Sequence, residues 1–192
     1  MKRIILTATA LVLALTLCAC SKGKNQISND GLSFSDLSSL TFWHGSGVGG
    51  WFTELSISPD GSFSGNFHDS EMGSFGDDYP HGTLYVCKFS GKFASLTKID
   101  GYEYSMRCES LTLDDPPGLE EIVDGMKIIT SDPAGFGNAN EFYLYLPGKK
   151  KDELPEQFLE WVWMAIDEDD DALTFYGLYN AGGEAGFIGD DG

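Results

Sequence analysis

Apolar and polar residues alternate with a period of two over much of the first half of the chain. The alternation runs over residues 51–58, stops at the sequence Pro-Asp-Gly at residues 59–61, and resumes over residues 63–67. A period of two places alternate side chains on one face of a strand, and Pro-Asp-Gly is a turn signal. The pattern predicts a β-hairpin with one apolar face.

A second alternating segment covers residues 83–99 and keeps its phase across Gly91. We therefore predict one long strand, bent at the glycine, rather than two short strands. Residues 100–101, Asp-Gly, are predicted to form a two-residue hairpin turn. That turn places Phe93 opposite Cys108 on the returning strand.

This register keeps Cys87 and Cys108 apart. The two residues lie about six positions apart along the ribbon, on the order of 20 Å at ~3.3 Å per residue. If the bend is instead a turn, they lie two strands apart, on the order of 10 Å. Export would permit a disulfide, but both separations exceed the ~7 Å Cα limit for one. The geometry predicts two buried thiols.

The second half of the chain adds further strands and one helix. Residues 119–130 are either a helical turn before a short strand or strand throughout, and residues 141–147 and 172–180 are strands. Residues 155–166 carry apolar side chains at helical spacing after a Pro-Glu first turn. This helix should end before the acidic residues 167–171, because acidic side chains oppose the dipole at a helix C-terminus.

Together these elements predict an all-β, mainly antiparallel domain of about seven to eight strands with one short helix near the C-terminus. Sequential antiparallel strands close into a barrel or pack as a sandwich, because open edges promote aggregation. We favour a lipocalin-like up-and-down β-barrel, formed by a single domain over residues 34–192.

The N-terminal residues predict export and lipid anchoring. A basic start and a short apolar core over residues 1–19 describe a signal peptide, too short to span a bilayer. Residues 17–20, Leu-Cys-Ala-Cys, resemble the bacterial lipoprotein signal, which implies that Cys20 is lipidated and held at the extracytoplasmic face of the membrane. Residues 20–33 would then form a flexible tether. An ordinary cleaved signal is the alternative.

The charge of the chain excludes nucleic acid as a partner. Removal of residues 1–19 leaves ten basic and 30 acidic residues, a formal net charge of −20, which repels phosphate backbones and anionic lipid head groups. We interpret the charges as scattered along the chain, which indicates solubility more than a specific partner.

The segment from Gly45 to Gly50 fits the spacing G-x-G-x-x-G of phosphate-binding loops. A dinucleotide site needs a helix after the glycines, and a kinase needs further signatures downstream. Here a strand pattern follows over residues 51–58, and the kinase signatures are absent from the sequence. We interpret the segment as a flexible lead into the first barrel strand.

Two sets of residues are candidates for binding. The carboxylates of Asp69, Glu71, Asp77 and Asp78 could surround calcium, which takes six to eight oxygen ligands; a solvated acidic loop is the alternative, and no other cofactor is expected. Inward-facing aromatic residues could line a cavity, because eight-stranded barrels sometimes hold one small molecule; core packing is the alternative. These aromatic candidates are Trp51, Phe67, Phe89 and Tyr104.

Several stretches resemble a family of uncharacterised lipoproteins of Firmicutes, many from gut clostridia. They include GSGVGGWFTELSISPDGSF, YPHGTLYVCKFSGKF and LPEQFLEW, and the resemblance covers most of residues 42–180. It implies a surface-anchored protein and is compatible with a lipocalin-like barrel. It brings no activity, ligand or catalytic residue.

The preferred functional hypothesis is a non-enzymatic, membrane-anchored module that binds a small apolar molecule, a glycan or a protein. One alternative is an extracellular, glycan-directed hydrolase with a pair of carboxylates. Another is an envelope interaction protein without a small ligand. Converging carboxylates in a concave pocket would favour the hydrolase, and a barrel packed with phenylalanine would favour the interaction protein.

Overall fold

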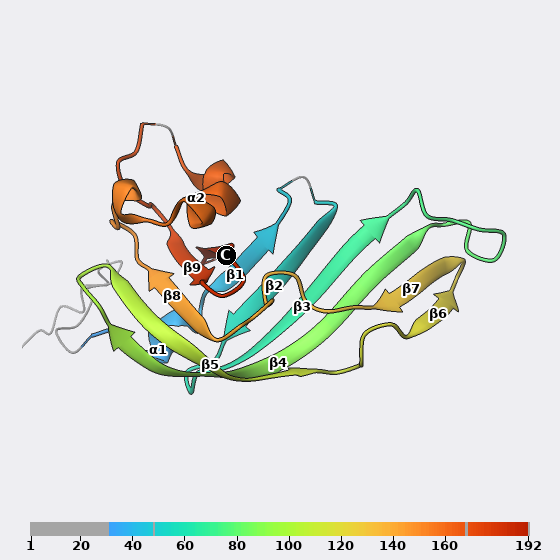
Figure 1. Cartoon of the computed structure of the whole chain (residues 1–192), viewed down its shortest axis with the longest axis horizontal. Coiled ribbons are helices and arrows are strands. Elements are labelled where there is room, and N and C mark those ends of the chain that lie inside the picture. Colours follow the sequence, from blue (N-terminus) through green and yellow to red (C-terminus); the bar gives the residue numbers. More distant parts are fainter. Residues whose placement is uncertain (1–30, 48, 168, 192) are drawn as a thin grey trace, which may run out of the picture.

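The fold is a closed antiparallel β-barrel with two additional strands (Figure 1). The computed structural model describes residues 31–191 except residues 48 and 168, so the predicted signal peptide and Cys20 lie outside the described residues. Eight strands pair in the closed order β1-β2-β3-β4-β5-β8-β9-β10, which confirms the predicted all-β, lipocalin-like architecture. They are β1 (Thr41–Gly45), β2 (Trp51–Ile57), β3 (Ser62–Glu71), β4 (Thr83–Lys98), β5 (Glu103–Leu113), β8 (Glu141–Tyr145), β9 (Tyr176–Asn180) and β10 (Ala185–Asp190).

The two additional strands form a hairpin beside the barrel. β6 (Glu120–Val123) pairs with β7 (Met126–Thr130), and β7 runs parallel to the first residues of β4. Residues 119–130 are therefore almost entirely strand and turn, which decides between the two alternatives left open by the sequence. Figure 1 shows this hairpin at the far side of the molecule from α2.

β4 is one continuous strand of 16 residues, as predicted. The predicted two-residue turn is wrong, because four residues separate Lys98 from Glu103. Phe93 nevertheless faces Cys108, as predicted. A β-bulge after Ala94 adds one residue to β4 and restores that register; within it, Ser95 has a φ of 59°. Cys87 and the half-buried Cys108 are both free thiols.

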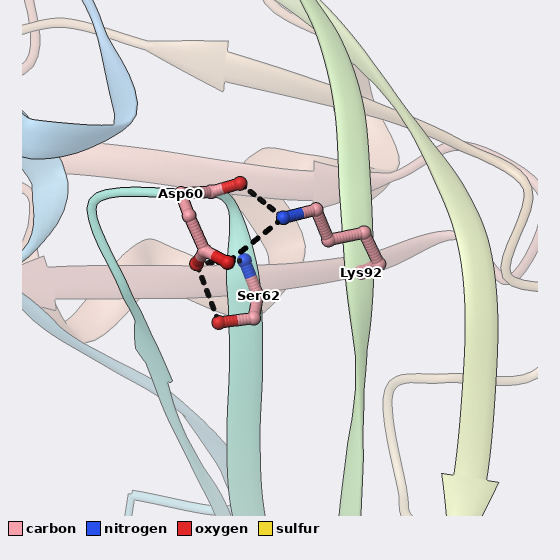
Figure 2. A network of polar contacts seen from close by, with 3 residues as sticks. All are labelled: Asp60, Ser62 and Lys92. Atoms are coloured by element: carbon pink, nitrogen blue, oxygen red, sulfur yellow. Dashed lines mark hydrogen bonds and ion pairs between the residues drawn. The ribbon is translucent and has the colours of Figure 1, made fainter.

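The turn between β2 and β3 is fastened to β4 (Figure 2). The carboxylate of Asp60 accepts hydrogen bonds from the backbone N–H and hydroxyl of Ser62, at 2.9 and 2.6 Å. It also pairs with the ammonium of Lys92 at 3.1 Å, and that ammonium donates to the Asp60 carbonyl oxygen. The Ser62 hydrogen bonds, followed by Lys92, hold the pKa of Asp60 well below its usual range. The side chains of Asp60 and Ser62 thus fix the conformation of the turn, and Lys92 ties the turn to β4.

Phenylalanine rings fill the barrel interior. Phe136, in the segment between β7 and β8, is buried among rings that come from the strands. Ring centroids lie 4.7 Å apart for Phe89 and Phe136 and 5.0 Å apart for Phe93 and Phe142. The short helix α1 (Phe34–Leu37) adds Leu37 to the same core, at the end of the barrel where β1 begins.

A second helix packs on the outer surface of the barrel. α2 (Glu156–Val162) continues into the 3₁₀ turn η2 (Trp163–Ala165), which confirms the helix predicted over residues 155–166; the 3₁₀ turn η1 (Lys151–Glu153) precedes it. Phe158 of α2 lies directly over Gly177 and Gly186, where an added Cβ would come within 2.4 and 3.0 Å of its ring. Those two glycines therefore let α2 sit close to β9 and β10. Within the described residues, no helix has the length and hydropathy needed to cross a bilayer.

A candidate aromatic binding groove

The predicted cavity residues are mostly part of the packed core. Phe89 and Tyr104 are buried inside the barrel, and Phe67 packs against the same cluster. The Tyr104 hydroxyl accepts a hydrogen bond from the backbone N–H of Leu32 at 3.1 Å, so the N-terminal segment of the domain already uses its polar group. Packing within the core, and for Tyr104 an internal hydrogen bond, therefore accounts for these three side chains.

The predicted calcium residues do not converge. Asp69 and Glu71 lie on β3, whereas Asp77 and Asp78 lie in the loop that follows. Among the described residues, no group of three or more histidine, cysteine or acidic side chains is placed to hold a metal ion. The structure therefore does not bring the four carboxylates together as the calcium hypothesis requires.

Trp51, the fourth cavity candidate, lies elsewhere. It lines one of two adjoining pockets at the end of the barrel opposite α1, and the chain's four tryptophans all contribute to these pockets. We call the first the histidine pocket, of about 220 Å³, and the second the helix pocket, of about 250 Å³; together they form the aromatic groove. The histidine pocket is lined by Trp43, His44, Trp51, Phe52, Trp161, Ile188 and three glycines, and the helix pocket by Ser46, Glu160, Trp161, Trp163, Met164, Ile188 and two glycines.

Strand pairing and α2 position the aromatic rings. Trp43 on β1 and Phe52 on β2 contact each other at a centroid separation of 5.2 Å. Trp161 of α2 reaches the edge of the barrel, with its ring 4.3 Å from His44 and 6.0 Å from Trp51. Its indole N–H donates to the carbonyl oxygen of Glu184 at 2.7 Å, which fixes the orientation of the ring.

The glycine-rich segment forms a wall of the groove. It connects β1 to β2, and a strand rather than a helix follows it, as predicted. Gly47 has a φ of 75°, and a Cβ there would lie 2.0 Å from the sulfur of Met164. A Cβ at Gly45 would lie 2.8 Å from the carbonyl oxygen of Trp51. Only glycine allows the connection to pass this close to η2 and β2, so the motif that resembles a phosphate loop has a steric role here.

His44 is a buried, neutral part of this wall. Its Nδ1 lies 2.9 Å from the carbonyl oxygen of Gly186, an acceptor, so the Nδ1–H donates. Burial lowers the pKa of His44, and the bond to Gly186 only partly opposes this shift. The imidazole is therefore uncharged at neutral pH, and all five rings of the histidine pocket are neutral.

The charges around the groove are segregated rather than scattered, which corrects the interpretation of the sequence. Lysine and arginine are absent between Lys24 and Lys88 and after Lys151. β1, β2, α2 and β10 all come from these two stretches. The acidic residues nearby are Glu54, paired with Trp43 across the strands, and Glu160 in the helix pocket. The groove is thus aromatic and lies in a negative environment.

The described carboxyl groups with a shifted pKa give no support to the hydrolase alternative. The pKa is lowered for all three, Asp36, Asp60 and Asp100, chiefly through hydrogen bonds from Ser33, Ser62 and Lys149, respectively. A general acid for glycoside cleavage needs the opposite shift.

No protein-family model, curated protein or solved structure matches this chain.

Proposed function

We propose that this protein is a membrane-anchored, extracytoplasmic lipoprotein that acts as a non-enzymatic binding module, and that the aromatic groove is its binding site. The observation that carries the proposal is the gathering of all four tryptophans around this groove. Trp43, Trp161 and Trp163 are 38%, 37% and 67% exposed. Large aromatic side chains that stay exposed together mark interaction sites, because folding alone would favour their burial.

Because the barrel interior is filled, a binding site in the groove is better supported than one in a cavity inside the barrel. The rings of Phe63, Phe89, Phe93 and Phe142 pack against one another and against Phe136. A ligand inside the barrel would have to displace this core. A ligand in the groove would cover exposed aromatic surface instead.

The position of the groove fits the proposed anchor. The described chain enters the barrel at α1, and β1 runs from there to the groove at the opposite end (Figure 1). A domain tethered through Cys20 can therefore present the groove away from the membrane. The proposal for the anchor itself rests on residues 1–20 of the sequence.

Site-specific photocrosslinking in intact cells tests the binding site. Benzoylphenylalanine would replace Trp163 in the groove of the full chain, and Ile122 on the β6–β7 hairpin as the control, since both side chains are exposed. We expect irradiation to give an adduct of defined mass from position 163 alone. The same adducts from both positions, or none from position 163, would contradict the assignment of the groove.

Metabolic labelling tests the anchor separately. The full chain should incorporate radiolabelled palmitate and fractionate with membranes, and Cys20→Ala should lose both properties. Membrane association that survives Cys20→Ala without label would refute the lipoprotein assignment.

A further inference from the structure

We propose that the histidine pocket binds a soluble organic cation of the quaternary ammonium type. This inference deepens the proposed function and rests on it, because it assigns a ligand class to one half of the aromatic groove. It is carried by the arrangement of the rings, by the charge around them and by the scarcity of hydrogen-bonding groups in the pocket.

Neighbouring rings that line the pocket stand at steep angles to each other. The interplanar angles are 60° for Trp43 and Phe52, 63° for His44 and Trp51, and 79° for Trp51 and Trp161. The face of an aromatic ring carries partial negative charge, so a cation that enters the pocket is attracted to the ring faces it meets there.

The surrounding charge favours a cation in the same place. The strands and helix of the groove contain no lysine or arginine, and the carboxylates of Glu54 and Asp69 project from residues paired with Trp43 and Trp51. The cation–π pair found among the described residues joins Lys127 to Tyr79, which lie outside the groove. Among the described side chains that line the pocket none is a cation, so an incoming cation meets no electrostatic repulsion from them.

The polar groups of the pocket select a cation without N–H groups. Among the described residues that line the pocket, His44 is the only side chain with nitrogen or oxygen apart from the indole N–H donors, and its Nδ1 already donates to Gly186. A sugar or a primary ammonium would lose hydrogen bonds to water and find few replacements. A quaternary ammonium has no N–H to satisfy. The volume of about 220 Å³ is also below the ~300 Å³ at which drug-sized sites begin, and suits a small headgroup.

The groove lies at the end of the barrel opposite α1, where the chain enters. A lipid head group and a soluble cation would present the same charge to the pocket, so the comparison of vesicles below distinguishes the two sources.

Titration with choline chloride tests the inference on the full lipidated chain, reconstituted in phosphatidylglycerol vesicles and followed by tryptophan fluorescence. Sodium chloride at equal concentration corrects for ionic strength. The neutral isostere 3,3-dimethylbutan-1-ol has the same shape without the charge. We expect saturable binding of choline and at least about tenfold weaker binding of the isostere, because cation–π attraction is lost.

Variants locate the site. Trp43→Leu and Trp161→Leu should each weaken choline binding by about tenfold. Ile122→Ala is the control, since Ile122 is exposed on the β6–β7 hairpin and lines neither pocket of the groove, and it should change the affinity less than twofold. Far-ultraviolet circular dichroism checks that each variant is folded, and Trp43 is exposed enough for its loss to leave the core intact.

Each contrary result has a defined meaning. Equal binding of choline and the isostere would overturn the cation assignment in favour of a merely apolar pocket. Weaker binding of choline in phosphatidylcholine vesicles than in phosphatidylglycerol vesicles would overturn the soluble source. Absence of saturable choline binding would overturn the ligand class. In that case an adduct at position 163 in the crosslinking experiment would still support the groove as a binding site. Failure of both experiments would refute both proposals.

Discussion

Replacement of Lys149 by methionine should destabilise the protein strongly at neutral pH. The Lys149 ammonium is buried and lies 2.9 Å from a carboxylate oxygen of Asp100, 2.9 Å from one of Glu103 and 3.2 Å from one of Glu153. It thereby joins the β4–β5 turn and β5 to the 3₁₀ turn η1, which precedes α2. Burial alone would lower the pKa of Lys149, but the hydrogen bonds to the three carboxylates outweigh it and raise that pKa.

The magnitude follows from the burial of the partners. Removing one partner of a buried ion pair costs ~3–5 kcal/mol, whereas exposed pairs contribute ~0–1 kcal/mol. Here the cation and Glu103 are largely shielded from water, and Asp100 and Glu153 are about half exposed. We therefore expect Lys149→Met to lower the free energy of unfolding by about 3 kcal/mol at pH 7. Lys150→Met is the matched control: Lys150 is exposed, and its loss should cost less than ~0.5 kcal/mol.

The pH dependence separates this electrostatic cost from a packing defect. Lys149 lowers the pKa of Asp100, so the stabilisation is present above the unfolded-state pKa of ~3.9 and is lost as the pH falls through the lower folded-state value. Urea unfolding at pH 7 and pH 3 measures both quantities. The difference between wild type and Lys149→Met should be smaller at pH 3, which lies below the unfolded-state pKa of ~3.9, so that the loss has begun. A difference that stays constant between the two pH values, or one below ~0.5 kcal/mol at pH 7, would refute the reasoning.

Two further substitutions test the core and the groove. Phe136→Ala should lower the free energy of unfolding by ~3–5 kcal/mol and open an apolar cavity that takes up benzene, because Phe136 packs against the rings of Phe89 and Phe142. A decrease below ~1 kcal/mol in urea unfolding would show that the loop of Phe136 does not fill the barrel. His44→Asn should flatten the pH dependence of stability below pH ~6.5. The lowered pKa of buried His44 makes wild type lose stability as the pH falls from that value toward the folded-state pKa, and equal slopes for both proteins would contradict this.

The first strands that the sequence predicts have one buried face. β2 has Thr53, Leu55 and Ile57 buried on its inner side, and the alternation along the sequence is clear. β1 and β10 escape prediction because they are short and contain glycine; in β1 the burial alternates, but the buried His44 is polar and the exposed Trp43 is apolar, so the sequence does not show it. In β10, α2 covers the outer face, so residues 185–187 are buried in succession. Where both faces are covered, the period of two disappears.

The sequence predicts single residues of the groove but not the groove itself. The sequence predicts Trp51 as a binding candidate and the structure places it in the lining of the groove, but its predicted partners inside the barrel prove to be core. Trp161 stands at helical spacing with other apolar residues, which predicts helix packing rather than a position at the rim of the barrel. The groove joins residues more than 100 positions apart, and periodicity within one element carries no information on such contacts. The signal available in the sequence is the absence of lysine and arginine from the two stretches that build it.

The two pockets differ in how firmly their side chains are held, and this difference divides their roles in recognition. In the histidine pocket, His44 is bonded to Gly186 and Trp161 to Glu184, and the rings contact one another. In the proposed function such a site would bind with a small ordering cost, and substitutions there should change affinity. In the helix pocket, Trp163 and Met164 are exposed on a single 3₁₀ turn. If the histidine pocket holds a cation as proposed, those side chains would adapt to the group attached to it, and substitutions there should change the choice among ligands that share the same charged group.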